Sequence, residues 1–196
     1  MIQEIKRLRE KAKLEGNPIL REKSFDLLLE TIKKHNPTHI LEIGVNTGLS
    51  GIAMLVTSPK ATLTGIEIDD DAIKMAKQNY VNFGVLDRAK IFQGDASEII
   101  PVLTGEYDFI FLDGPKGHYF EYLPHLLSVL KKGGVLFADN VLFRGYVFSN
   151  EKTPQKYNTT RFSMEKFLTA ITNDKNLQTQ IYDLEDGVSI TVKTNE

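Results

Sequence analysis

The stretch THILEIGVNTGLS, residues 38–50, decides the fold, because it joins a strand to a glycine-bearing turn and the start of a helix. Residues 38–43 are mostly apolar and β-branched, as buried strands are. Gly44 allows a sharp turn where the strand ends, and Gly48 allows a ligand to approach the chain closely. The helix that follows offers free N–H groups to a negative group. The stretch therefore predicts a ligand-binding turn at the carboxyl end of the strand.

The same alternation continues along the chain. Further short apolar segments predict strands at residues 61–66, 89–92, 107–112 and 134–138, and segments of helical period lie at roughly 48–57, 70–83, 96–104 and 118–131. Residues 69–71, three aspartates, supply an N-cap, and Lys131-Lys132-Gly133-Gly134 is typical of a helix stop. This alternation predicts an α/β fold, with a mostly parallel sheet covered by helices on both faces.

The two ends of the chain differ from its middle. Residues 1–36 predict two helices, broken near residues 16–18, and residues 161–174 predict one more. In the tail, residues 177–182 and 188–192 flank Glu185-Asp186-Gly187, which predicts an antiparallel hairpin. We expect one domain over residues 1–196, with N-terminal helices at 1–36 and the core at 37–196.

Composition excludes several classes of protein. The chain has 196 residues, of which 41% are hydrophobic and 26% charged, which is ordinary for a globular protein. It has no cysteine, which excludes disulfides, thiolate metal sites and a cysteine nucleophile. No apolar run is long enough to span a membrane, and the charged N-terminus does not resemble a secretory signal, so we expect a cytoplasmic protein. With a net charge of −2, any contact with RNA must come from a local basic patch.

Acidic residues near the strand ends add to the glycine turn. Gly44 and Gly48 have G-x-x-x-G spacing, which differs from the G-x-G-x-x-G of dinucleotide folds. Glu42 lies two residues before Gly44. Glu67 ends the second strand, where a carboxylate can accept hydrogen bonds from ribose hydroxyls. A solvated acid at a strand end is the alternative interpretation. The arrangement favours a nucleoside site.

The third strand ends in Gly94, Asp95 and Ala96. A glycine and a short acid suit the edge of an adenine ring. Asp95 followed by Glu98 is also a capping-box pattern, and the two interpretations are compatible.

A second cluster follows the fourth and fifth strands. Asp113 comes after the fourth strand, and Asp139 and Asn140 come at the end of the fifth. These ends should lie at one edge of a parallel sheet, where ligands bind. Two carboxylates and an amide oxygen suit Mg²⁺ rather than zinc. Lys116, three residues beyond Asp113, is a candidate general base.

Three segments resemble the metal-dependent class I O-methyltransferases, the group of catechol and caffeoyl-CoA O-methyltransferases. They are EIGVNTGLS at 42–50, FLDGPKGHY at 111–119 and GGVLFADNVLF at 133–143, and the resemblance extends over roughly residues 17–193. It implies the Rossmann-like class I methyltransferase fold with seven strands. It also implies S-adenosylmethionine (SAM) and Mg²⁺, or another hard divalent cation, as cofactors.

The resemblance assigns roles to particular residues. Asp113, Asp139 and Asn140 would bind the metal, and Lys116 would take the acceptor proton, with Asp113 also counted as catalytic. The cofactor-binding set would be Glu42, Gly44, Val45, Gly48, Ser50, Glu67, Ile68, Gly94, Asp95, Ala96 and Asp113. The metal would bind two adjacent acceptor oxygens, and the oxyanion would attack the SAM methyl group in line.

The sequence departs from the family at three places. Residues 114–115 are Gly-Pro where many members have alanine after the aspartate, and Leu49 stands where an aromatic residue is common. The N-terminus is shorter than in the plant enzymes, which argues against a bulky CoA thioester as acceptor.

Two acceptors remain open. Residues 139–145 and 186–190 resemble the bacterial tRNA 5-hydroxyuridine methyltransferases, and Lys116, Arg144 and Arg161 would suit an anticodon backbone. Basic residues of the first helix could contribute or could be an ordinary solvated face. The alternative is a small catechol-like molecule. Relatives are commonly dimers, so we expect a homodimer.

Two other classes fit the sequence less well. A nicotinamide-dependent oxidoreductase is disfavoured by the glycine spacing. A non-catalytic SAM-binding or RNA-binding module is disfavoured by the intact set of metal ligands and lysine.

Overall fold

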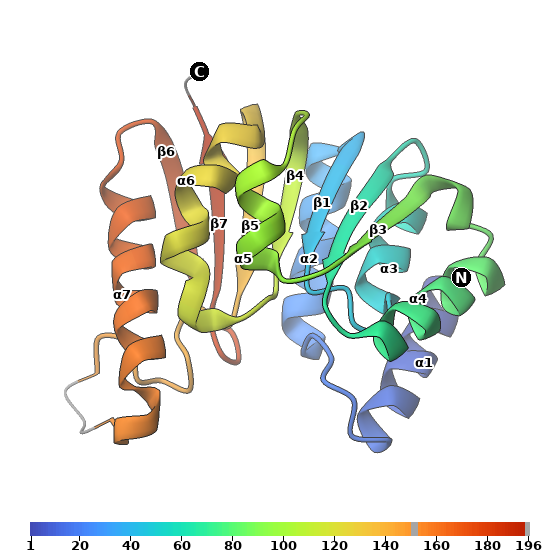
Figure 1. Ribbon diagram of the computed structural model, residues 1–196, viewed down its shortest axis with the longest axis horizontal. Helices are drawn as coiled ribbons and strands as arrows, with labels where there is room; N and C mark the ends of the chain where they lie inside the picture. The colour runs from blue at the N-terminus through green and yellow to red at the C-terminus, as the bar shows by residue number, and fades with distance from the viewer. Residues whose placement is uncertain (150–152, 195–196) are drawn as a thin grey trace. The chain divides into compact units, whose positions relative to one another are not determined.

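The computed structural model describes residues 1–149 and 153–194 (Figure 1). The chain divides into two compact units, Met1–Ala96 and Ser97–Glu196, and we describe each by itself. The expectation of one domain over residues 1–196 stays a prediction.

The first unit is built on three parallel strands in the order β3-β2-β1. Its elements are α1 (Ile2–Leu14), α2 (Glu22–His35), β1 (His39–Ile43), α3 (Leu49–Thr57), β2 (Thr62–Glu67), α4 (Asp70–Asn82), the 3₁₀ turn η1 (Leu86–Arg88) and β3 (Ala89–Gln93). Ile40 and Leu41 of β1 and Ile66 of β2 are buried in the core of this unit. Asp69 caps α4 as predicted, because its carboxylate accepts from the N–H groups of Asp71 and Ala72.

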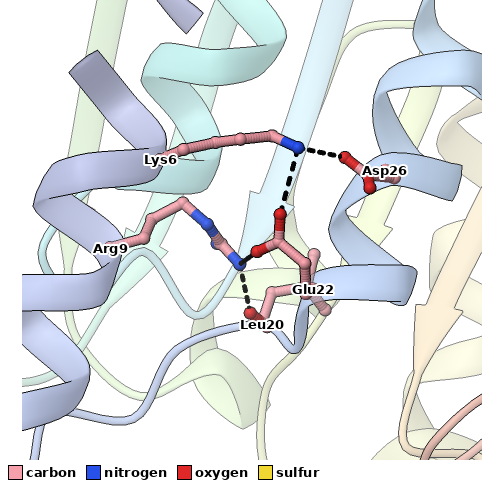
Figure 2. A network of polar contacts seen from close by, with 5 residues as sticks. All are labelled: Lys6, Arg9, Leu20, Glu22 and Asp26. Atoms are coloured by element: carbon pink, nitrogen blue, oxygen red, sulfur yellow. Dashed lines mark hydrogen bonds and ion pairs between the residues drawn. The ribbon is translucent and has the colours of Figure 1, made fainter. Parts of the chain in front are cut away.

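Two N-terminal helices are confirmed, and a polar network joins them (Figure 2). The buried guanidinium of Arg9 on α1 donates to the carbonyl oxygen of Leu20 and lies 3.7 Å from the centre of the Phe25 ring. Lys6 pairs with Glu22 at 3.0 Å and with Asp26 at 2.8 Å, both on α2. These basic side chains therefore stabilise the packing of α1 on α2.

The second unit contains four strands in the order β4-β5-β7-β6. Its elements are α5 (Ala96–Ile99, which starts at the last residue of the first unit), η2 (Ile100–Val102), β4 (Tyr107–Leu112), η3 (Lys116–His118), α6 (Tyr119–Val129), β5 (Leu130–Asp139), η4 (Gln155–Tyr157), α7 (Asn158–Asn173), β6 (Leu177–Tyr182) and β7 (Val188–Lys193). β4 and β5 are parallel, whereas β7 is antiparallel to both β5 and β6. The predicted C-terminal hairpin is thus confirmed.

Two predicted helix boundaries in this unit are wrong. The helix expected to stop at residues 131–134 already ends at Val129, and Lys131 and Lys132 lie in β5. The glycines there accompany an irregular β4–β5 register instead of a helix cap. The helix expected at 96–104 gives way to 3₁₀ structure at Ile100, because Pro101 has no N–H to donate. Within the described ranges, no helix combines the length and apolarity needed to cross a membrane.

Candidate active site

The turn after β1 takes the backbone conformation that its glycines predicted. Gly44, Asn46 and Gly48 all have positive φ, at 90°, 47° and 77°. The N–H of Gly44 donates to the carbonyl oxygen of Ile66 at 3.0 Å, which fixes the turn against the end of β2. Gly48 is the N-cap of α3, which starts at Leu49.

The close approach at Gly48 is made by α4. A Cβ atom at Gly48 would lie 2.7 Å from Cε1 of Tyr80 and 3.0 Å from Cβ of Ala76. The absence of a side chain at Gly48 therefore lets α3 and α4 pack together. From the sequence, the same glycine was interpreted as leaving room for a ligand. Contact between Gly48 and a cofactor stays a prediction.

Glu67 is held at the end of β2 by three backbone N–H groups. Its Oε2 accepts from Asn46 at 2.8 Å, and its Oε1 accepts from Ile68 at 2.8 Å and from Asp69 at 3.0 Å. These bonds join the glycine turn to the end of β2 and orient the carboxylate. A carboxylate has about four acceptor positions, so Glu67 keeps capacity for a ribose hydroxyl.

Asn46 is a residue that the sequence analysis missed. Besides its bond to Glu67, its side-chain amide donates to the carbonyl oxygen of Pro18 at 2.8 Å, which ties the segment between α1 and α2 to the turn. An asparagine between two glycines is a signal for the left-handed conformation it adopts here.

Glu42 and Ser50 form a pair beneath the turn. The carboxylate of Glu42 is completely buried and accepts a hydrogen bond from the hydroxyl of Ser50. Tyr80 lies nearby, and burial together with the charge of Glu42 raises its pKa well above the usual value. Glu42 thus positions Ser50 at the start of α3, and direct cofactor contact by either residue stays a prediction.

Val45 is also buried and packs against β2, and contact between Val45 and a cofactor stays a prediction. A Cβ atom on Gly65 would come 2.4 Å from Cγ2 of Val45, so the valine fills the space that this glycine leaves on β2. The side chain therefore stabilises the contact between the turn and β2.

The other residues predicted to bind the cofactor lie around the ends of β2 and β3. Ile68 is 63% exposed although it is large and apolar. Gly94 donates its N–H to the carbonyl oxygen of Glu67 at 2.9 Å, which brings the two strand ends together. Asp95 is exposed and Ala96 is buried. An exposed apolar side chain next to an oriented carboxylate suits a nucleoside.

Replacing Glu67 by glutamine should weaken SAM binding about 10- to 150-fold, since hydrogen bonds to a charged group contribute about 1.5–3 kcal/mol. Glutamine keeps the shape and one acceptor oxygen, but its NH2 group cannot accept from the N–H groups that the other carboxylate oxygen serves. Isothermal titration calorimetry with SAM measures the effect. Asp71→Asn, at an exposed acid on α4, is the matched control and should leave the affinity unchanged. Equal Kd values for Glu67→Gln and the parent would contradict the assignment.

In the second unit, the predicted metal ligands follow paired strands. Leu112 of β4 pairs with Ala138 of β5, so Asp113 and Asp139 follow directly at the same edge of the sheet. Asp139 is almost fully buried, and Asn140 has a φ of 59°. The predicted juxtaposition of these ligands at the carboxyl ends of β4 and β5 is therefore present in the backbone.

Lys116 lies beside the first of these carboxylates. Its Nζ donates to Oδ1 of Asp113 at 2.8 Å, and the two side chains are 25% and 23% exposed. Lys116 is the first residue of the short 3₁₀ turn η3, and the bend at residues 113–115 leads into it from the end of β4. A partly buried amine is therefore held next to a predicted metal ligand.

Tyr119 is a further residue that the sequence analysis missed. Its buried hydroxyl lies 3.0 Å from the carbonyl oxygen of Leu112 and 3.3 Å from that of Asp139, to which it donates. Burial and the charges of Asp113 and Asp139 raise its pKa well above the usual value, so the hydroxyl keeps its proton. The tyrosine cross-links the ends of β4 and β5, where the predicted metal ligands lie.

The donor set fits a hard cation. Among the described residues, no group of three or more His, Cys, Asp or Glu side chains could hold a metal. Asp113, Asp139 and Asn140 instead offer two carboxylates and one amide oxygen. Mg²⁺ suits such a set, because it takes few protein oxygens and keeps other positions for water or substrate.

The strands, the glycine turn and the carboxylate on β2 define an α/β protein of the nucleoside-binding class. The chain belongs to the O-methyltransferase family, whose model matches residues 1–194. A catechol O-methyltransferase of Niastella koreensis is 32% identical over 147 residues, which cover 72% of this chain and 65% of that protein. A caffeoyl-CoA O-methyltransferase of Populus kitakamiensis is 27% identical over 81% of this chain and 71% of its own length.

Solved structures agree with this assignment. A Staphylococcus aureus protein provisionally described as a caffeoyl-CoA O-methyltransferase matches 96% of this chain and 91% of its own, with 27% identity and a TM-score of 0.88. The Podospora anserina methyltransferase PaMTH1, solved with S-adenosylhomocysteine, matches 90% of this chain and 80% of its own at 25% identity and a TM-score of 0.80. The class I methyltransferase fold, with seven strands and a C-terminal hairpin, is confirmed. The chain is a SAM-dependent O-methyltransferase.

Proposed function

We propose that this enzyme uses Mg²⁺, or another hard divalent cation, to methylate a hydroxyl group that has a second oxygen next to it. The observation that carries the proposal is the Lys116–Asp113 pair, 2.8 Å apart, at the sheet edge that also bears Asp139 and Asn140. A base next to a set of hard oxygen ligands suits the deprotonation of such an acceptor.

The first unit supplies the groups for SAM. Glu67 would accept from a ribose hydroxyl, and Ile68, Gly94, Asp95 and Ala96 would surround the adenine. Gly44, Val45 and Gly48 would form the turn around the methionine end, and Ser50, oriented by Glu42, would donate to its carboxylate. The three backbone bonds to Glu67 support this role, because they fix the carboxylate before the nucleoside binds.

The second unit supplies the groups for the acceptor. Asp113, Asp139 and Asn140 would hold the cation, which when bound supplies Lewis acidity to the acceptor oxygens. Asp113 also accepts from Nζ of Lys116, so its carboxylate would serve both the cation and the amine. In its neutral amine form, Lys116 would accept the proton of the acceptor hydroxyl at Nζ. Tyr119 would keep the ends of β4 and β5 at a fixed separation.

The acceptor in this proposal is 5-hydroxyuridine in tRNA or a small catechol-like molecule, since both present two adjacent oxygens. The catechol reading is supported by the relative from Niastella koreensis. The tRNA reading is supported by Arg144, which is exposed shortly after Asn140.

Other basic residues expected to meet RNA are occupied within the chain. Arg161 pairs with Glu165 at 2.8 Å and donates to Thr153 at 3.0 Å, so it stabilises its own unit. On the first helix, Lys6 and Arg9 stabilise the contact with α2. The contacts of these three side chains support a role in stabilising the fold and not in binding RNA.

Two assays separate the acceptors. Nucleosides of tRNA from a deletion strain, analysed by mass spectrometry, should lack 5-methoxyuridine-type modification if tRNA is the acceptor. Purified enzyme with labelled SAM and Mg²⁺ should methylate a catechol such as 3,4-dihydroxybenzoate if the acceptor is small. Unchanged tRNA nucleosides would rule out the tRNA reading, and failure of both assays would rule out the acceptor class. A cytoplasmic homodimer stays part of the proposal, and analytical ultracentrifugation tests the dimer.

A further inference from the structure

The segment from Asn140 to Ser149, which follows β5, has an unusual backbone. Phe143, Arg144 and Phe148 have φ of 41°, 59° and 56°, in the left-handed region that bulky residues rarely adopt. Such a backbone persists only where its surroundings hold it, and it is concentrated at functional sites. The segment begins at Asn140, one of the proposed metal ligands.

Two acids from elsewhere in the second unit hold this segment. Asp186 lies in the β6–β7 turn, and its buried carboxylate accepts from the N–H of Arg144. The backbone carbonyl oxygen of Asp186 accepts from the N–H of Leu142 at 2.9 Å. Glu165 on α7 accepts from the N–H of Phe148 at 3.1 Å. The strained conformation is thus fixed from both sides.

The held segment presents aromatic rings together with cations. The Tyr157 ring lies 5.6 Å from the Phe143 ring and is stacked on Tyr146 at 5.9 Å. The guanidinium of Arg144 lies 5.0 Å from the centre of the Tyr157 ring and donates to the Tyr157 hydroxyl at 3.2 Å. Nζ of Lys156 lies 4.9 Å from the centre of the same ring. We call these five residues the aromatic–basic patch.

The two cationic side chains of the patch are accessible to a ligand. Arg144 and Lys156 are exposed, and the three rings are half-buried. Fixed aromatic faces with cations beside them match single-stranded RNA, whose unpaired bases stack on aromatic rings while its phosphates meet basic groups. A small neutral catechol would leave the two cations without a counter-charge.

We propose that the aromatic–basic patch binds RNA next to the acceptor nucleotide, with an unpaired base stacked on Tyr157 and phosphate groups at Arg144 and Lys156. The inference rests on the tRNA reading of the proposed function, and it assigns specificity for RNA to these residues.

The test measures binding of an anticodon stem-loop RNA, with 5-hydroxyuridine in its loop, by fluorescence anisotropy over a series of salt concentrations. Tyr157→Ala should weaken binding about 5- to 150-fold, because it removes a stacking ring and also the side chain that holds Arg144 and Lys156. Arg144→Ala and Lys156→Ala should each lower the slope of log K against log salt by about 0.7, as expected for one phosphate contact to a single strand.

Two variants serve as controls. Tyr157→Trp keeps a stacking face and should retain most of the affinity, which separates loss of stacking from loss of folding. Lys90→Ala removes another cation held over a ring, at 4.2 Å from the centre of Phe92 on β3, and should change neither affinity nor slope.

The inference is overturned if Tyr157→Ala binds RNA as the parent does, or if Lys90→Ala weakens binding as much as Lys156→Ala. A parent enzyme that methylates a catechol and binds no stem-loop would also overturn it, while leaving metal-dependent O-methyl transfer intact. A parent enzyme that binds the stem-loop through the patch but methylates neither acceptor would contradict the proposed function alone.

Discussion

Replacing Lys116 by alanine is expected to slow methyl transfer about 10²- to 10⁴-fold, the range that a positioned general base contributes. The affinity for SAM should not change, because the groups assigned to SAM in the first unit keep their contacts. Single-turnover methyl transfer from labelled SAM at saturating acceptor measures the chemical step. Calorimetry with SAM measures binding separately.

The matched control variant, Lys116→Arg, separates a role as base from a role that needs only positive charge. Arginine keeps the positive charge and the ion pair with Asp113, yet it does not lose its proton under ordinary conditions and cannot serve as the base. If Lys116 is the base, Lys116→Arg should be as slow as Lys116→Ala. Recovery of near-parental rates in Lys116→Arg would mean that the residue only neutralises or positions Asp113.

Replacing Asp139 by asparagine should reduce methyl transfer on the order of a thousandfold at limiting Mg²⁺, since a metal ion contributes several kcal/mol of charge stabilisation. The substitution keeps the size of this buried side chain and removes its charge. Raising the Mg²⁺ concentration should restore part of the rate. Titration of activity against Mg²⁺, for the parent and the variant, measures the shift in metal requirement.

Chelation and a surface variant complete this test. Treatment with EDTA should abolish activity in the parent, and added Mg²⁺ should restore it. Asp113→Ala should lose activity as Asp139→Asn does, whereas Glu121→Gln, at an exposed acid on α6, should behave as the parent. An Asp139→Asn enzyme with parental rates at every Mg²⁺ concentration would show that Asp139 is not a metal ligand.

Most of the fold could be predicted, because its signals are local. Short β-branched runs, the aspartate cap of α4 and the Asp-Gly turn between β6 and β7 each act over a few neighbouring residues. The errors occurred where the outcome depends on pairing with a distant segment. Lys131 and Lys132 resemble the end of a helix, but residue 130 pairs with Tyr107 and draws them into β5.

The candidate site, too, was predictable only in part. The sequence placed Asp113, Lys116 and Asp139 correctly at the ends of β4 and β5, since parallel strands end at one edge. It could not show that Tyr119 lies beneath them, because nothing in a tyrosine seven residues after Leu112 reveals where its hydroxyl points. Nor could it show that Tyr80 fills the space at Gly48.

By itself, the sequence determined the class of enzyme. The glycine turn, the acid on β2, and the acids, amide and lysine at the ends of β4 and β5 are residue types at fixed sequence positions. Only the tertiary structure decided how these groups are held, because partners such as Asn46 with Glu67, or Asp186 with Arg144, are 21 and 42 residues apart in the chain. Such contacts arise from packing, which no local pattern encodes.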